Sequence, residues 1–195
     1  MEPVAVILAG GRAQRMGGGD KCRLDLGGTT IIAEVLRRLR PQCGRMALSA
    51  NGDPARFADL GLPVLPDSEP DHPGPLAGLL VGMDHAASLG ADRVLTVAGD
   101  TPFLPPDLYA RLQGDGAIAL ASSNGVRHPV VGLWRVDLRD DLRAALRRGE
   151  RAVGRWALDH GARLVDFPVQ AHDPFFNVNT AEDLEVARTI HLAMR

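Results

Sequence analysis

A glycine-rich stretch near the amino terminus carries the residues whose types and spacing best suit chemistry. Gly10-Gly11 and Gly17-Gly18-Gly19 alternate with the cationic residues Arg12, Arg15 and Lys21. Glycines leave backbone N–H groups open to a ligand because no Cβ stands in the way. Arginine and lysine add positive charge and hydrogen-bond donors that suit phosphate oxygens. The pattern therefore predicts a loop that binds a polyphosphate.

Two familiar phosphate-binding motifs do not match this stretch. No G-x-G-x-x-G opens a helix, so the dinucleotide-binding fingerprint fails. The P-loop motif needs a glycine immediately before its lysine, whereas Asp20 precedes Lys21. An ordinary glycine-rich surface loop is the alternative, and the two arginines and the Asp20-Lys21 pair count against it.

The loop must be held by regular elements, and the chain around it alternates strand and helix patterns. Residues 4–8 are a short apolar run typical of a buried parallel strand. Further strands are predicted over 46–50 and 62–65, with helices between them over 31–39 and 54–60. This order indicates a parallel sheet with helices on both faces. The expected fold class is α/β, a three-layer α/β/α architecture around a mostly parallel, Rossmann-like sheet.

The second half of the chain continues the alternation and shows no linker, so we expect a single domain over residues 1–195. Apolar alternation on both sides of 122–128 makes that gap a hairpin-like turn or a loop over the site. Thr180 and Asp183 form a capping-box pattern ahead of the closing helix. The predicted strands are 93–98, 117–121, 129–134, 164–167 and 175–178, and the predicted helices are 75–87, 105–112, 138–148, 152–160 and 181–194.

Polar residues follow three more of the predicted strands: Asn51, Asp67 and Asp100. Ligands of open α/β sheets bind outside the carboxyl ends of the strands, so these residues and the glycine-rich loop should line one crevice. A carboxylate there needs a cationic partner, and Mg²⁺ bound to a triphosphate would supply it for Asp100. The alternatives are a turn or helix-capping role for Asp100 and an Asx-turn at Asp67.

Composition excludes several other classes of protein. The 24 acidic and 22 basic side chains give a formal charge of −2, which offers no electrostatic footprint for nucleic acid or an anionic membrane. Two cysteines make neither a metal pattern nor a disulfide framework. No secretory signal and no run of about 18 apolar residues is visible, so a soluble, cytoplasmic protein is expected. The arginines over 143–155 alternate with acidic residues, which is typical of a solvated helix face.

Several motifs together resemble the molybdenum cofactor guanylyltransferases, within the NTP-dependent nucleotidyltransferases. Each motif alone is weak, but their order and their spread over nearly the whole chain make the set specific. Two departures are Cys22-Arg23 after the lysine and Ala181 in place of a proline that opens the last helix. The matching segments are Leu8-Ala9-Gly10-Gly11, Arg15-Met16-Gly17, Asp20-Lys21, Asp67 with residues 73–78, Gly99-Asp100-Thr101-Pro102-Phe103, Arg127-His128-Pro129 and Phe176-Asn177-Val178-Asn179-Thr180.

The resemblance implies a fold of the nucleotide-diphospho-sugar transferase type and a reaction that moves GMP from GTP to molybdenum-molybdopterin, releasing pyrophosphate. It implies Mg²⁺ as cofactor, bound by Asp100, and charge stabilisation of the reacting phosphates by Lys21 and Arg15. His128, Asn177 and Asn179 would belong to the side that meets the pterin. The residues implied in nucleotide binding are Leu8, Ala9, Gly10, Gly11, Lys21, Asn51, Asp67 and Asp100.

Other functions stay open at this point. The related CTP-dependent molybdopterin cytidylyltransferases tend to read Leu-Ala-Ala-Gly at the loop and lack the paired asparagines, so Gly10-Gly11 and Asn177-x-Asn179 favour GTP. A sugar or alditol nucleotidyltransferase is more distant. A non-catalytic paralogue that binds nucleotide or cofactor is a different class, and intact Lys21 and Asp100 count against it. The resemblance also allows transient contacts with cofactor-delivery proteins or molybdoenzymes, whereas the charge balance argues against nucleic acid or membrane partners.

Overall fold

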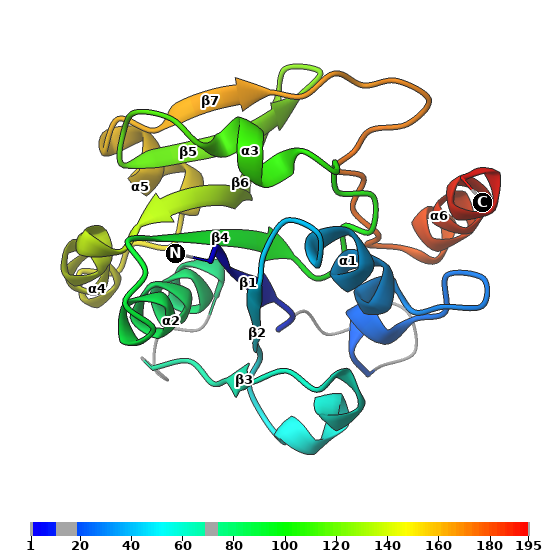
Figure 1. Cartoon of the computed structure of the whole chain (residues 1–195), viewed down its shortest axis with the longest axis horizontal. Helices are drawn as coiled ribbons and strands as arrows, with labels where there is room; N and C mark the ends of the chain where they lie inside the picture. Colours follow the sequence, from blue (N-terminus) through cyan, green and yellow to red (C-terminus); the bar gives the residue numbers. More distant parts are fainter. Residues whose placement is uncertain (1, 11–18, 69–73, 195) are drawn as a thin grey trace.

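The computed structural model describes residues 2–10, 19–68 and 74–194, so the predictions made for Gly11 and Arg15 lie outside the described residues. Within those ranges, seven strands form one sheet in the order β3-β2-β1-β4-β6-β5-β7 (Figure 1). The strands are β1 (Val4–Leu8), β2 (Arg45–Ser49), β3 (Val64–Leu65), β4 (Arg93–Ala98), β5 (Ile118–Ser123), β6 (Val126–Arg135) and β7 (Arg163–Asp166).

The sheet is mostly parallel, as predicted. Strand β1 pairs in parallel with both β2 and β4, β3 pairs in parallel with β2, and β7 with β5. Strand β6 runs antiparallel to its two neighbours, β4 and β5. The carboxyl ends of β1, β2, β3 and β4 therefore meet along one edge of the sheet.

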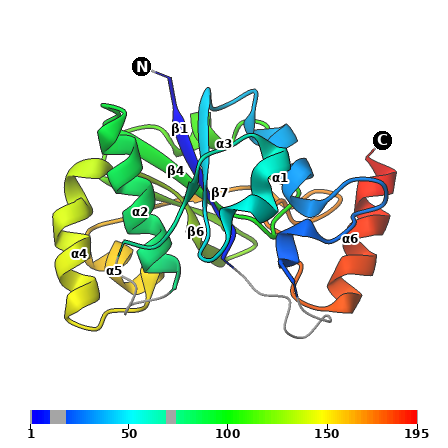
Figure 2. The same ribbon diagram turned by 90° about the horizontal axis from the view of Figure 1, so that it is seen from below.

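Helices cover both faces of the sheet and complete the predicted three layers (Figure 2). Helices α2, α4 and α5 share one buried cluster with the sheet, whereas α1 and α3 share the cluster on the opposite face. Among the described residues, no helix is both long and apolar enough to cross a lipid bilayer. The helices are α1 (Ile31–Leu39), α2 (Pro75–Ser88), α3 (Leu108–Leu112), α4 (Arg139–Arg147), α5 (Val153–Asp159) and α6 (Ala181–Ala193), with 3₁₀ turns η2 (Lys21–Arg23), η3 (Pro54–Leu60) and η4 (Val136–Leu138).

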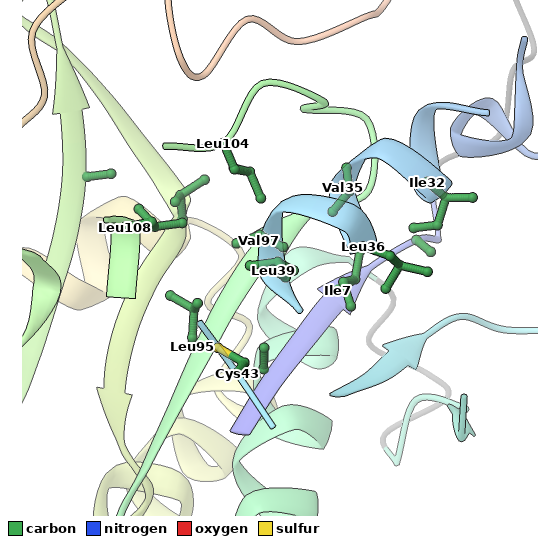
Figure 3. Close-up of a cluster of buried hydrophobic side chains, with 14 of the residues drawn as sticks. Ile7, Ile32, Val35, Leu36, Leu39, Cys43, Leu95, Val97, Leu104 and Leu108 are labelled. Carbon is green, nitrogen blue, oxygen red and sulfur yellow. The ribbon is translucent and has the colours of Figure 1, made fainter. Parts of the chain in front are cut away.

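Helix α1 shows how the sequence builds one of these layers. Thr30 caps its first turn by accepting a hydrogen bond from the backbone N–H of Ala33. Apolar residues recur at helical spacing and form one buried stripe. Figure 3 shows this stripe packed over strands β1 and β4. The packed side chains are Ile32, Val35, Leu36 and Leu39 of the helix with Ile7, Leu95 and Val97 of the strands.

The 122–128 gap is a tight hairpin, not a loop over the site. Strand β5 continues through Ser123 and β6 begins at Val126, so only Asn124 and Gly125 form the turn. Both have positive φ, 48° and 75°, which is the backbone conformation of a two-residue hairpin turn and the reason for an Asn-Gly pair here. The hairpin alternative is confirmed and the loop alternative is wrong.

The strand predicted over 175–178 is wrong. Pro174 lacks an N–H, and a turn follows it in which the Phe176 N–H donates to the Asp173 carbonyl. The Val178 N–H then donates to the Asp100 carbonyl, at 3.0 Å, instead of joining a ladder. The predicted edge strand at 164–167 is confirmed as β7. The capping box of Thr180 and Asp183 is also confirmed.

Candidate functional site

A cavity of about 450 Å³ lies where the first four strands of the parallel region end. Its wall combines residues that directly follow β1, β2, β3 and β4 with the start of helix α2. This is the position that the topology of an open α/β sheet gives to a ligand. The lining residues are Leu8, Gly10, Ser49, Ala50, Asn51, Asp67, Gly74, Pro75, Gly78, Ala98, Asp100, Val130 and Asn177.

Lys21 and Asp100 meet at one side of this cavity. The Lys21 Nζ lies 2.5 Å from Asp100 Oδ2, and both side chains are largely buried, 12% and 17% exposed. Lys21 also donates to Asn179 Oδ1 at 2.6 Å, and Asn177 Nδ2 donates to Asp100 Oδ1 at 3.0 Å. Four residues predicted from distant motifs thus form one hydrogen-bonded network, in which the lysine and the carboxylate pair with each other and each contacts one asparagine.

The end of the glycine-rich stretch is tied to the loop after β2. Asp20, which precedes Lys21, forms an ion pair with Arg56 at 2.8 Å. The same guanidinium donates to the Asn51 carbonyl at 2.6 Å. Arg56 could not be identified from the sequence, because this arginine lies in a short 3₁₀ turn with no motif around it. It fixes the spacing between the lysine and Asn51.

Asn51 and Asp67 are joined by two reciprocal hydrogen bonds. Asn51 Nδ2 donates to Asp67 Oδ2 at 2.7 Å, and the Asp67 N–H donates to Asn51 Oδ1 at 2.8 Å. Asp67 therefore shapes its turn and also lines the cavity. The turn role and the ligand-binding role predicted for this residue are thus compatible. A carboxylate and an amide are held side by side for a polar ligand.

Glycine at position 78 lets helix α2 approach the strand ends. A Cβ on Gly78 would lie 2.9 Å from Ser49 Oγ and 3.1 Å from Leu8 Cδ2, so both side chains would have to shift to admit it. The first turn of α2, from Gly74 and Pro75, consequently opens onto the cavity. Backbone N–H groups at a helix amino terminus favour an anion.

Ala9 and His128, which were also predicted for the site, do not line the first cavity. Ala9 is buried just behind the cavity wall, and its N–H donates to the Ser49 carbonyl. His128 does not line the cavity; its Nε2 lies 2.7 Å from Ser123 Oγ and its ring lies 4.6 Å from that of Phe175. The pterin-side role implied for His128 stays a prediction.

A second cavity, of about 730 Å³, adjoins the first and shares Pro75 and Val130 with it. Arg127, Arg151 and Arg155 line it. Arg151 and Arg155 are exposed, as the solvated face predicted over 143–155 requires, and both also line this cavity. Sequence alone could not show this, because the turn after β5 brings Arg127 to two arginines that flank the start of α5. The three guanidiniums suit an anionic ligand.

The side chains at the cavity fit Mg²⁺ only in an arrangement with a single protein carboxylate. Within the ranges that the structure describes, no three His, Cys, Asp or Glu side chains gather where they could hold a metal ion. Asp100 offers one carboxylate at the cavity wall. Mg²⁺ is commonly bound through one or two carboxylates, with phosphate oxygens and waters as its other ligands. Asp100 fits that arrangement.

Three partly buried histidines predict how the stability of the fold depends on pH. Desolvation lowers the pKa of His85, His128 and His172 below the usual 6.5; Arg38 adds to this at His172, and Asp173 opposes it at His128 and His172. The unfolded chain then binds more protons than the folded chain just below pH 6.5. We expect the free energy of unfolding in urea to fall between pH 7.5 and pH 5.5, and to fall less in His85→Gln. An increase in the free energy of unfolding as the pH is lowered from 7.5 to 5.5 would contradict the lowered pKa values assigned to these histidines.

Comparison with known proteins agrees with this geometry. The model of the MobA-like NTP transferase domain matches residues 5–163. A molybdenum cofactor guanylyltransferase of Bradyrhizobium sp. is 51% identical over 193 residues, covering 95% of this chain and 91% of that protein. One from Cereibacter sphaeroides is 48% identical over 192 residues, covering 97% of each.

Solved structures show the same fold. Molybdopterin-guanine dinucleotide biosynthesis protein A of Archaeoglobus fulgidus superposes with a TM-score of 0.76 at 22% identity, covering 98% of this chain and all of that one. A CMP:2-keto-3-deoxy-manno-octonic acid synthetase complexed with CTP gives 0.74 at 16% identity, covering both chains completely. From the domain match and the identity to full-length relatives together, the chain belongs to the MobA-like NTP transferase family.

Proposed function

We propose that this protein transfers GMP from GTP to molybdenum-molybdopterin, forming molybdopterin guanine dinucleotide and pyrophosphate. The observation that carries the proposal is the network of Lys21, Asp100, Asn177 and Asn179 at the cavity wall. It unites a phosphate-binding cation and a metal-binding carboxylate, as nucleotidyl transfer requires. Relatives about half identical over nearly their whole length carry the name of this activity.

The nucleotide occupies the first cavity in this proposal. Leu8, Gly10, Asn51 and Asp67 line it and would contact GTP, while Lys21 binds its phosphates. Gly11 and Arg15, outside the described residues, keep the roles that the family resemblance gives them. Mg²⁺, held by Asp100, would neutralise charge on the triphosphate and help pyrophosphate to leave.

The chemistry needs no covalent enzyme intermediate. A terminal phosphate oxygen of the pterin attacks the α-phosphorus of GTP in line, and the bond from that phosphorus to the bridging oxygen breaks. That oxygen departs with pyrophosphate, so atoms and charge balance. Lys21 keeps its proton at Nζ and offsets charge on the transferring phosphate. The protein supplies position and electrostatics.

The acceptor approaches from the second cavity. Arg127, Arg151 and Arg155 supply positive charge there, and the shared wall at Pro75 and Val130 makes the two ligands neighbours. Asn177 lines the first cavity and contacts Asp100, which suits a group that meets the acceptor phosphate beside the reacting centre.

Thermal stability with different nucleotides tests the proposal most directly. With Mg²⁺ and every nucleotide at the same concentration, near 100 times the Kd of GTP, we expect GTP to raise Tm by about 5–10 °C and CTP or ATP, which should bind more weakly, to raise it less. Pyrophosphate release with molybdenum-loaded pterin should then follow the same order. Equal shifts with CTP would overturn the base assignment, and GTP binding without pyrophosphate release would favour the non-catalytic paralogue.

Gly10→Ala tests the base preference separately. Among the described residues, a Cβ at Gly10 would meet no atom within 4 Å, so the fold should tolerate the change. Because Gly10 lines the cavity, the added methyl should crowd the purine and lower the GTP-over-CTP ratio of kcat/KM by about 10–200-fold. An unchanged ratio would remove Gly10 from base selection.

We also propose a cytoplasmic location and direct contacts with cofactor-delivery proteins or recipient molybdoenzymes. Cys22 and Cys43 are free and buried, and burial raises the pKa of each thiol to about 12. Such thiols are unreactive and need no oxidising compartment. Co-purification of a molybdoenzyme with the tagged protein would support these contacts.

A further inference from the structure

We propose that Ser123, His128 and Asp173 are positioning residues that hold the segment 173–179 in register, so that Asn177 and Asn179 reach Asp100 and Lys21. This inference rests on the proposed function, since it assigns a role in the same reaction. In this proposal His128 acts on the site through its hydrogen bond to Ser123, instead of by direct contact with the pterin.

Ser123 stands at the centre of the cluster and is completely buried, 0% exposed. Its Oγ lies 2.7 Å from His128 Nε2 and 2.9 Å from each carboxylate oxygen of Asp173. Ser123 is the last residue of β5 and His128 lies in β6, so the hairpin supplies two of the three groups. Asp173 comes from a loop fifty residues later in the chain.

The donor and acceptor groups of the three side chains determine which of them donates each hydrogen bond. An ionised carboxylate only accepts, so the Ser123 hydroxyl donates to Asp173. His128 must then carry its proton on Nε2 and donate to Ser123 Oγ. This arrangement is the reverse of a hydrolytic triad, because the imidazole is a donor toward the serine and Asp173 contacts the serine instead of the histidine. The cluster therefore suits a structural role.

The segment that follows Asp173 is anchored at two further residues, Phe175 and Val178. The Asp173 carboxylate also accepts from the Phe175 N–H at 2.8 Å, which starts the turn. The buried Phe175 ring packs between His128, at 4.6 Å, and Phe167, at 5.2 Å. Val178 is fully buried, and its N–H donates to the Asp100 carbonyl. The hairpin thus holds one end of the segment and the Asp100 loop holds the other.

The site asparagines lie within this anchored stretch. Asn177 precedes Val178 and reaches the Asp100 carboxylate, while Asn179 follows it and reaches Lys21. Both asparagines are exposed, so packing of their own side chains does not fix them. Their positions depend on the backbone, and the Ser123 cluster fixes that backbone on its amino-terminal side.

Ser123→Ala tests the inference, with Ser122→Ala as matched control. Ser122 is the adjacent residue, is also buried (7% exposed), and has its hydroxyl 3.4 Å from Asp166. Hydrogen exchange of peptides over 173–180 should be about 10-fold faster or more in Ser123→Ala, the loss expected for a hydrogen bond to a charged group. Exchange in Ser122→Ala should match the wild type there. Equal exchange in both variants would overturn the proposal.

Kinetics give the second measurement. In Ser123→Ala, kcat for pyrophosphate release should fall about 10-fold or more while KM for GTP changes little, because nucleotide-binding residues are untouched. Asp173→Asn keeps an oxygen acceptor for Ser123 and should retain most of kcat, whereas Asp173→Ala should not. Faster exchange with unchanged kcat would overturn the positioning role. Should Ser123→Ala fail to fold, the two Asp173 variants decide the question alone.

The two proposals fail in different ways. A wild-type protein that releases no pyrophosphate from GTP and the pterin would overturn the proposed function, and the exchange rates over 173–180 would still report whether Ser123 and Asp173 hold the segment. A wild-type protein that turns over, with Ser123→Ala equal to Ser122→Ala in kcat, would overturn only the positioning role.

Discussion

Lys21→Ala is expected to lower kcat for pyrophosphate release by about 10²–10³-fold, the usual loss for one preorganised group that stabilises charge at a reacting centre. Lys21 is held 2.5 Å from Asp100 and 2.6 Å from Asn179, so its ammonium is already positioned before substrate arrives. Asp100→Ala should have an effect at least as large, because the carboxylate that fits Mg²⁺ is then gone. Steady-state assays with GTP and molybdenum-loaded pterin measure both.

The matched control is Arg23→Ala. Arg23 lies two residues from Lys21, in the same 3₁₀ turn, and its guanidinium pairs with the exposed Asp59 at 2.9 Å. Surface ion pairs of this kind contribute little, so kcat should stay within about threefold of the wild type. Circular dichroism should show that Asp100→Ala keeps the fold. Turnover like that of the wild type in either Lys21→Ala or Asp100→Ala would remove that residue from the mechanism.

Trp134→Ala is expected to destabilise the protein by about 3–5 kcal/mol, the range for removing a large buried aromatic side chain. Trp134 is completely buried in β6, and its ring N–H donates to Thr96 Oγ1 at 2.8 Å. Thr96 in turn donates to the Val130 carbonyl, so the tryptophan supports the contact between β4 and β6. Urea denaturation at pH 7.5 measures the change.

Two variants separate packing from hydrogen bonding at this position. Trp134→Phe keeps an aromatic ring but leaves Thr96 without its donor, and should cost about 1–3 kcal/mol. Leu158→Ala, at a partly exposed residue of α5, should change stability by about 0.5 kcal/mol or less. A loss below about 1 kcal/mol in Trp134→Ala would show that the core around β6 collapses into the space.

The site was predictable where chemistry and topology agreed. Lys21 and Asp100 belong to loops that follow two adjacent parallel strands, β1 and β4, so the carboxyl-end rule was enough to bring them together. Asn51 and Asp67 follow β2 and β3 for the same reason. Periodicity likewise placed α1, whose apolar stripe is unbroken.

Some residues that line the two cavities, among them Val130 and Arg151, were not predicted for the site. Strand β6 runs antiparallel, so its amino-terminal half, with Val130, lies at the edge where the other strands end. Arg127 and Arg151 come together only through the hairpin and the start of α5. The segment over 175–178 has an apolar pattern like a strand, but its N–H groups bond to a turn and to Asp100. Tertiary contacts determine where these residues lie, and the local sequence does not encode such contacts.

The direct contact between Lys21 and Asp100 couples two ligands. Under the proposed function, a polyanion that binds the ammonium and a divalent cation that binds the carboxylate would each replace the same ion pair. Whichever arrived first would release the other side chain, so each ligand would raise the affinity for its companion by an identical factor. Nucleotide and metal would then load cooperatively, and neither alone would reach its full affinity.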